Sequence, residues 1–313
     1  MRVAVIMPCR NVTQYVDASV RSALMQEGVD LQLIAVDDGS TDGTIERLRA
    51  LESAHPGAMH VITSGQSGAC AARNAGLRHT DAPLVRFLDA DDALLPGALQ
   101  RQGALMQRTG ADVVAGAYVK RYPDGRPEEV ETPWTGDAWE GLVRTRLGTT
   151  SANLFRREAV LAAGGWDESL RSSQDYELLF RMLKRGARVV VDETPSAIVL
   201  KREQGSISRT DERANWIRYI ELRRAMRDHL RDVDPVRHAR VIAVANQYLF
   251  MAIRVLSRHD RQAAFAAFDR LLPAGFVPSV SPATTAAYVK AYRWLGFRMA
   301  ERLAGLIGRM TRA

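Results

Sequence analysis

The chain has 313 residues, of which 46% are hydrophobic and 25% are charged, and it carries a net charge of +7. These values are ordinary for a globular chain of two domains, and the positive charge suits an anionic ligand or a membrane surface. Because no DNA- or RNA-binding motif accompanies that charge, we expect no nucleic-acid partner.

Cys9 and Cys70 are the only cysteines, and their spacing is not that of zinc ligands. We expect reduced thiols and a cytoplasmic protein. The chain passes from Met1 directly into a predicted strand, so the sequence also predicts no signal peptide.

The first predicted strand ends in polar residues. The apolar run at residues 3–7 is stopped by Pro8 and followed by Arg10 and Asn11, before a helical pattern over residues 15–26. In an open parallel sheet, ligands bind beyond the carboxyl ends of the strands. We therefore expect the strand ends of this sheet to converge on one site.

The second predicted strand runs into an acidic turn. Residues 31–36 form an apolar run that leads into Asp37 and Asp38, and a helix is predicted over residues 44–51. Asp37 and Asp42 are expected to shape the turn and to cap that helix.

Small residues then open a predicted helix. Gly68 and the alanines after it allow close approach of the backbone, and Arg73 and Asn74 lie on the first turns. A helix N-terminus beside a guanidinium suits a phosphate group. The alternative is a tightly packed helix whose Arg73 pairs with a structural carboxylate.

Three carboxylates, Asp89, Asp91 and Asp92, follow the next predicted strand. If the strand continued through the first two, both side chains would lie on one face. Oxygen ligands of this kind favour Mg²⁺ or Mn²⁺, which take further ligands from water and phosphate. The alternative is a solvated acidic turn, with Asp92 as the N-cap of a helix that begins near residue 95.

A second group of elements follows residue 108, and Asp175 opens its last helix. The helix dipole stabilises a carboxylate at that position, so Asp175 accepts a proton readily only if burial or a neighbour raises its basicity. The other elements expected here are strands over 111–119 and 150–155, a short helix over 157–163 and a loop over 164–168.

The chain resembles the inverting glycosyltransferases of family 2 from about residue 3 to residue 208. The resemblance rests on an ordered set of motifs. They are VIMPCRN (5–11), VDDGSTDGT (36–44), GACAARNAG (68–76), FLDADD (87–92), and GGWDESL (164–170) leading to QDYE (174–177).

The resemblance implies an α/β protein with the GT-A nucleotide-diphospho-sugar transferase fold, a Rossmann-like mixed sheet flanked by helices. It implies a donor site in which Asp38 accepts the base N–H of a uridine-type nucleotide. Asp91 is the implied principal ligand of Mn²⁺ or Mg²⁺, with Asp89 beside the ribose and the metal. The implied donor-binding residues are Pro8, Arg10, Asn11, Asp38, Arg73, Asp89, Lys201 and Arg202.

On the acceptor side, the resemblance makes Asp175 the general base, with Asp167 and Glu177 as lesser candidates. Trp166 is a candidate sugar platform beside Asp167, and the alternative is that its ring is a hydrophobic plug. The implied reaction is a single in-line displacement with inversion at the anomeric carbon.

Residues 200–208 resemble the family's flexible lid, in which Lys201 and Arg202 would clamp the diphosphate. Glu203 stands where the family often has His, which puts a third metal-side ligand in doubt. The alternative is a mobile surface loop.

We expect a GT-A domain over 1–209, with a donor half (1–108) and an acceptor half (109–209), and a helical C-terminal region over 210–313. Residues 240–256 predict a buried helix, too short and interrupted to span a bilayer. Residues 284–313 predict an amphipathic helix with six basic residues and one acidic residue. Its apolar stripe either lies on an anionic membrane or packs on residues 241–256.

The expected function is metal-dependent glycosyl transfer, from a donor that is more often UDP-linked in this family, to a glycan or lipid-linked acceptor of cell-surface polysaccharide synthesis. The expected location is cytoplasmic, with peripheral membrane contact. One alternative is a sugar nucleotidyltransferase, but the Gly-rich basic loop expected after its first strand is missing at residues 7–11. A non-catalytic nucleotide-sugar-binding protein is the other.

Overall fold

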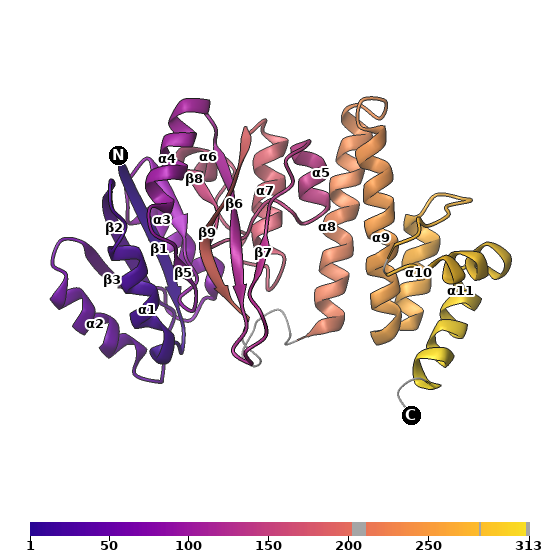
Figure 1. Ribbon diagram of the computed structural model, residues 1–313, viewed down its shortest axis with the longest axis horizontal. Helices are drawn as coiled ribbons and strands as arrows, with labels where there is room; N and C mark the ends of the chain where they lie inside the picture. The colour runs from indigo at the N-terminus through magenta and orange to yellow at the C-terminus, as the bar shows by residue number, and fades with distance from the viewer. Residues whose placement is uncertain (202–210, 282, 311–313) are drawn as a thin grey trace. The chain divides into compact units, whose positions relative to one another are not determined.

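The structure is a computed structural model that describes residues 1–201, 211–281 and 283–310. The chain divides into two compact units, Met1–Ser206 and Ile207–Ala313 (Figure 1). The predicted domain boundary between residues 209 and 210 falls outside the described residues.

The first unit is built from nine strands and seven helices along its described length. Its strands are β1 (Arg2–Cys9), β2 (Asp30–Asp37), β3 (Met59–Thr63), β4 (Leu84–Phe87), β5 (Ala93–Leu94), β6 (Val113–Arg121), β7 (Glu129–Glu131), β8 (Leu154–Arg156) and β9 (Val189–Leu200). Its helices are α1 (Thr13–Leu24), α2 (Thr44–Ala54), α3 (Ala69–Arg78), α4 (Ala98–Thr109), α5 (Ala138–Val143), α6 (Arg157–Ala162) and α7 (Gln174–Lys184).

The strands form one mixed sheet in the order β3-β2-β1-β4-β8-β6-β9-β5, with β7 paired to β6. The strands β3, β2, β1 and β4 run parallel, whereas β8 is antiparallel to both β4 and β6. The predicted mixed α/β sheet is thus confirmed. Its parallel pairs are β3, β2, β1 and β4 from the first ninety residues, and β6 with β9.

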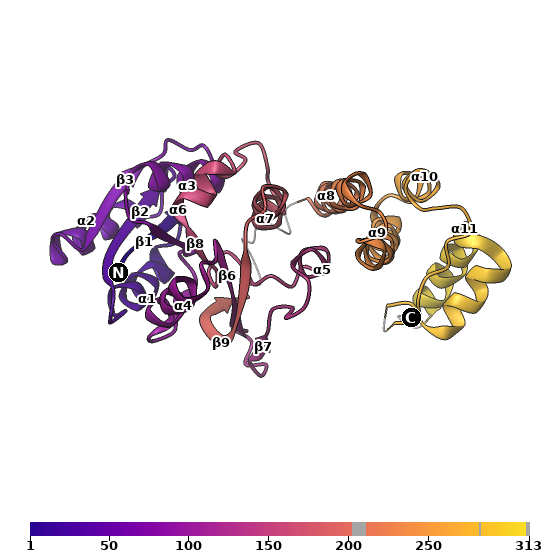
Figure 2. The ribbon, with the colours of Figure 1, turned by 90° about the horizontal axis from the view of Figure 1, so that it is seen from above.

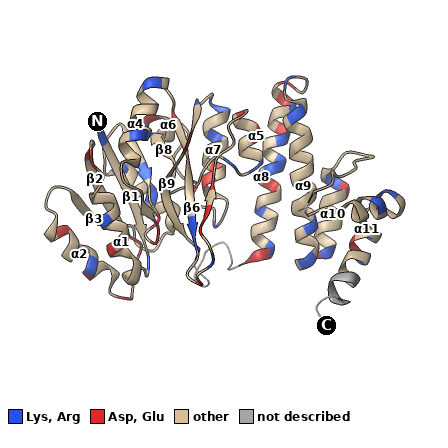
Figure 3. Cartoon of the chain, in the orientation of Figure 1, with Lys and Arg blue, Asp and Glu red and all other residues tan. Residues whose placement is uncertain are grey.

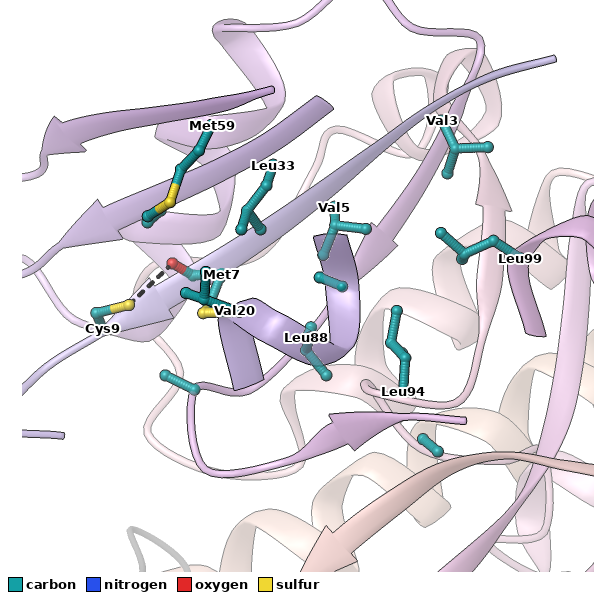
Figure 4. Close-up of a cluster of buried hydrophobic side chains, with 14 of the residues drawn as sticks. Val3, Val5, Met7, Cys9, Val20, Leu33, Met59, Leu88, Leu94 and Leu99 are labelled. Carbon is teal, nitrogen blue, oxygen red and sulfur yellow. Dashed lines mark hydrogen bonds between the residues drawn. The ribbon is translucent and has the colours of Figure 1, made fainter. Parts of the chain in front are cut away.

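Helices cover both faces of this sheet, with α1 and α4 on one side and α3 and α6 on the other (Figure 2). The space between the sheet and α1 is a hydrophobic core. Val3, Val5 and Met7 of β1 belong to it and are 0% exposed. Figure 4 shows Val5 and Met7 on the side of Leu33, and Val3 next to Leu99. The Cys9 thiol donates to the carbonyl of Met7 at 3.4 Å. Burial of this apolar surface is the main stabilising contribution to the unit.

The polar ends of β1, β2 and β4 meet at one edge of the sheet. The Asp38 N–H donates to the Cys9 carbonyl at 2.8 Å, and the Leu88 N–H donates to the Ile6 carbonyl at 3.0 Å. Because the three strands are parallel neighbours, their carboxyl ends must share this edge. The expected convergence of the strand ends is confirmed.

The acidic segment after β4 differs from the prediction. The strand ends at Phe87, and the N–H of Asp92 donates to the carbonyl of Asp89 at 2.9 Å, which closes a β-turn. The short strand β5 follows, so α4 begins only at Ala98 and Asp92 does not cap it. Asp89 and Asp91 are therefore brought together by a turn rather than by an extended strand.

The second unit consists of α8 (Glu212–Val233), α9 (Ala239–His259), α10 (Arg261–Leu271) and α11 (Ala286–Met310) in its described part. Phe250 and Ile253 of α9 are 0% exposed and pack with residues of α10 and α11. The predicted buried helix is confirmed, but the prediction that it is too short is wrong. At 21 residues, α9 is long and apolar enough by composition to cross a membrane, although it packs as a core helix here.

Helix α11 is bent at Gly296, where φ is 72° and ψ is 172°. That conformation lies outside the helical region and suits a residue without Cβ. The apolar stripe predicted for this segment is therefore not continuous: Tyr288 is buried in the core of the second unit, whereas Leu295 is 48% exposed.

Candidate active site

The carboxylate turn, residues Asp89 to Asp92, is fixed by one buried serine. Ser151 accepts a hydrogen bond from the Asp89 N–H at 3.1 Å and donates its own hydroxyl to Asp92 Oδ2 at 2.6 Å. Asp92 Oδ1 accepts from the Leu200 N–H at 3.0 Å, at the end of β9. Asp92, which is 5% exposed, is thus a positioning residue that ties the carboxylate turn to β9 and to the turn before β8.

The turn concentrates negative charge. Burial and the charges of Asp89 and Asp91 raise the pKa of Asp92 well above its usual range. Among the described residues, no group of three His, Cys, Asp or Glu side chains is arranged to hold a metal ion. Two carboxylates still fit Mg²⁺ or Mn²⁺, because such ions commonly take one or two protein carboxylates and complete their shell with phosphate oxygens and water.

Arg73 of α3 links this turn to the start of α7. Its Nη2 donates to Asp89 Oδ1 at 2.7 Å, and its Nη1 donates to Gln174 Oε1 at 3.0 Å. The guanidinium also lies 4.6 Å from the ring centroid of Trp166 and is only 5% exposed. Both hydrogen bonds of Arg73 go to protein groups, as expected if Arg73 pairs with a carboxylate rather than with a phosphate. The carboxylate in question, Asp89, belongs to the candidate metal motif.

Asp175 lies on the first turn of α7, next to Gln174. Burial raises its pKa, the charge of Asp89 raises it further, and the charge of Arg73 and the N–H of Tyr176 lower it. The net direction is upward despite the helix N-terminus. This is the condition under which a carboxylate at this position accepts a proton readily.

The other two candidate bases are engaged elsewhere. Asp167 is exposed and accepts from the N–H and hydroxyl of Ser169, whose hydrogen bonds lower its pKa. Glu177 forms two hydrogen bonds of 2.7 Å with Arg181, one turn further along α7. The hydrogen bonds to Asp167 favour its charged carboxylate, which is the weaker base, and both oxygens of Glu177 are held by Arg181.

Asp38 is more deeply buried than we expect of a residue that hydrogen-bonds a nucleotide base. It is 2% exposed, and Oδ1 accepts from the Ser64 hydroxyl and the Ser67 N–H, both at 2.8 Å. The Gly68 N–H also donates to both oxygens. In this structure Asp38 therefore holds the loop 64–68 in place. Asp37 shapes its turn as expected, accepting from the N–H groups at residues 39 and 40.

The remaining donor-side residues surround these two turns. Arg10 reaches Asp38 Oδ2 at 3.4 Å and is half-exposed, and Asn11 accepts from the Thr41 N–H at 2.9 Å. Pro8 lies within β1, opposite Val36 of β2. Lys201 is exposed and follows Leu200, whose N–H is bonded to Asp92. Arg202 and Glu203 lie outside the described residues.

Trp166 is a packing residue in this structure. It is 2% exposed, its ring meets Phe87 edge-on at 5.0 Å, and the Arg73 guanidinium covers it. Asn74 clamps the surrounding loop by accepting from the Trp166 N–H and donating to its carbonyl, both at 2.8 Å. The arrangement favours the hydrophobic plug over the sugar platform, because no ring face is open to an acceptor.

Sequence reasoning did not assign a role to three positioning residues. Ser151 lies in a segment without a motif, and Gln174 lies in the QDYE motif, but its role appears only through its contact with Arg73. Arg86 of β4 is 0% exposed, where an apolar residue is the rule. It donates to the Ser151 carbonyl at 2.6 Å and to Gln102, and burial lowers its pKa to about 9.

Residues 4–160 match the family model described as Glycosyl transferase family 2. TuaG of Bacillus subtilis (strain 168), named for teichuronic acid biosynthesis, is 28% identical over 186 residues, which are 59% of this chain and 73% of TuaG. The succinoglycan biosynthesis protein ExoU of Rhizobium meliloti (strain 1021) is 30% identical over 205 residues, which are 59% of this chain and 58% of ExoU. The match thus spans little more than half of ExoU.

Solved structures share the fold at low identity. S. aureus TarS 1–349 in complex with UDP-GlcNAc superposes with a TM-score of 0.72 at 18% identity, covering 96% of this chain and 91% of that one. The mannosyltransferase PcManGT from Pyrobaculum calidifontis, in complex with GDP-Man and Mn²⁺, gives a TM-score of 0.59 at 19% identity, covering 97% and 86%. These likenesses establish a GT-A transferase fold.

Proposed function

Because this chain belongs to glycosyltransferase family 2 and is a glycosyltransferase, we propose that it moves a sugar from a nucleotide-diphosphate donor to an acceptor hydroxyl with inversion. The observation that supports this most is the link through Arg73. One guanidinium contacts the carboxylate turn and the residue before Asp175. The candidate donor site and the candidate base are thus held next to each other.

We propose that Asp89 and Asp91 hold Mn²⁺ or Mg²⁺ together with the donor diphosphate. Asp89 is accessible for this, since its side chain is 39% exposed while Arg73 holds only Oδ1. When bound, the cation would neutralise the charge that develops on the leaving diphosphate. Asp92 supports the turn from behind and is not a ligand in this proposal, because both its oxygens accept hydrogen bonds from the protein.

Asp175 serves as the general base. Its carboxylate takes the proton of the acceptor hydroxyl while that oxygen forms a bond to the anomeric carbon, and the bond to the diphosphate oxygen breaks. Attack opposite the leaving group inverts the anomeric configuration. Arg73 fixes the positions of Gln174 and Asp89 relative to each other, so that the general base Asp175 and the donor are correctly oriented for reaction.

We propose that the donor is a UDP-sugar and that its uracil base lies near Asp38 and Arg10. TarS binds UDP-GlcNAc, which supports UDP, whereas PcManGT binds GDP-Man. Since Asp38 is engaged by Ser64, Ser67 and Gly68, its use as an acceptor for the base N–H requires the loop 64–68 to release it. Lys201 and Arg202, at the end of β9 and beyond, are the proposed diphosphate clamp.

The proposed acceptor is a glycan or lipid-linked glycan in cell-surface polysaccharide synthesis, on the cytoplasmic side of the membrane. Relatives named for teichuronic acid and succinoglycan biosynthesis support the polymer class. The two free cysteines agree with a reducing compartment. Here the acceptor enters from the side of α7, which carries Asp175.

The test is release of nucleoside diphosphate from UDP- and GDP-sugars in the presence of Mn²⁺ and lipid-linked glycan acceptors. We expect acceptor-dependent turnover with one donor, an inverted product linkage by NMR, and turnover abolished by chelator. Glu177→Gln serves as the matched control for Asp175→Asn, because both change a carboxylate on the first turn of α7. Equal activity in both variants would contradict the assignment of the base.

A further inference from the structure

Residues around the bend at Gly296 in α11 are either deeply buried or strongly exposed. On the inner side, Phe297 and Ala300 are 3% and 1% exposed and belong to the core of the second unit. Four large apolar residues close to the bend are exposed: Trp294 by 81% and Leu295 by 48% before it, and Met299 by 44% and Leu303 by 39% after it. We call these four residues the outer face of α11.

Along the described part of α11, the exposed charged residues beside the outer face are basic. Lys290, Arg293, Arg298 and Arg302 are all exposed, and basic positions recur along α11 in Figure 3. Arg298 pairs with Asp269, whereas Lys290, Arg293 and Arg302 form no ion pair with any residue that the structure describes.

The single acidic residue of residues 286–305 does not offset this charge. Glu301 is 8% exposed and accepts from Arg254 at 2.6 Å and from Ser257 at 2.8 Å, on the inner side of the helix. The polarity of α11 is therefore sharply divided. Its acid is buried and neutralised, while its outward surface combines apolar side chains with positive charge.

We propose that the outer face of α11 binds the surface of an anionic membrane. Met299 and Leu303 lie one helical turn apart after the bend, and Trp294 and Leu295 directly precede it. Exposed apolar residues with a tryptophan and flanking Lys and Arg match a segment lying in the interface, where the cations meet anionic headgroups. A second copy of the chain is disfavoured, because a symmetric contact through this face would bring its own arginines together. The inference goes beyond the proposed function and does not depend on the donor site.

The experiment uses the full chain and sedimentation with vesicles of phosphatidylcholine alone or with an equal part of phosphatidylglycerol. We expect several-fold stronger binding to the anionic vesicles, weakened by salt because exposed charges are screened. The triple variant Leu295→Gln, Met299→Gln, Leu303→Gln should bind at least about tenfold more weakly, since it removes the buried apolar contribution.

The matched control is Val233→Gln, Val236→Gln, Val280→Gln, which changes three valines of the same unit that are 61%, 86% and 63% exposed. It should bind like the wild type. A second variant, Arg293→Glu with Arg302→Glu, leaves the apolar residues intact and should lose the preference for anionic vesicles.

Three results would overturn the proposal. They are equal binding to both vesicle types, wild-type binding by the outer-face variant, and a concentration-dependent dimer that this variant abolishes while vesicle binding is absent. Neither donor nor acceptor is present, so failure here is distinct from failure of glycosyl transfer.

Discussion

Arg73 Nη2 lies 2.7 Å from Asp89 Oδ1, in an ion pair whose guanidinium side is 6% exposed and whose carboxylate side is 39% exposed. The pair therefore spans from the interior to the surface of the candidate site. Because Arg73 also donates to Gln174, a change at this residue should affect both the carboxylate turn and the start of α7.

Replacement of Arg73 should change the pH dependence of catalysis. Burial raises the pKa of Asp175 from 3.8, and the positive charge of Arg73 lowers it. A general base acts when deprotonated, so kcat/KM should fall as the pH drops through this raised pKa. Arg73→Gln removes the lowering influence and should move that acidic limb to higher pH. A pH–rate profile checks this. An acidic limb at the same pH in both proteins would show that Arg73 does not influence the pKa of the general base.

Asp175→Asn should lower kcat by about 10²- to 10⁴-fold, the usual contribution of a general base. Donor affinity should stay within about twofold, because a base acting on the acceptor adds little to donor binding. Turnover and calorimetric donor titration measure the two effects. A variant with near-normal kcat and weakened donor binding would place Asp175 on the donor side instead.

Ser151→Ala should destabilise the protein by about 1–3 kcal/mol, because it leaves a buried oxygen of Asp92 without its partner. Ser53→Ala is the control: its hydroxyl bonds to the Arg49 carbonyl on an exposed helix surface, and the change should cost less than about 0.5 kcal/mol. Urea unfolding of both variants gives the comparison. Similar values would show that the Ser151 bond contributes little.

Trp166→Ala should destabilise by about 3–5 kcal/mol, as expected when a buried tryptophan is truncated. Trp294→Ala, at an 81% exposed tryptophan, should cost less than about 0.5 kcal/mol. Thermal unfolding distinguishes these outcomes. Wild-type stability in Trp166→Ala with a raised acceptor KM would restore the sugar-platform role.

The sequence was sufficient to predict the strands β1, β2 and β4 and the edge where their polar ends meet, because apolar runs that stop at Asp or Pro mark strand ends. It failed where a backbone turn replaced an extended strand, at Asp89 to Asp92, since residue spacing does not show where pairing with β1 stops. Trp166 illustrates the same limit. Its burial depends on Asn74 and Arg73, which lie about ninety residues away in the sequence.

The most direct measurement is calorimetric titration of UDP and GDP, each with Mn²⁺, Mg²⁺ or chelator, into the wild type and Asp91→Ala. We expect metal-dependent binding of one nucleotide, lost at least about tenfold in the variant, because two carboxylates without a cation would repel the diphosphate. Binding that is unchanged by chelator and by Asp91→Ala would contradict a metal site at the carboxylate turn.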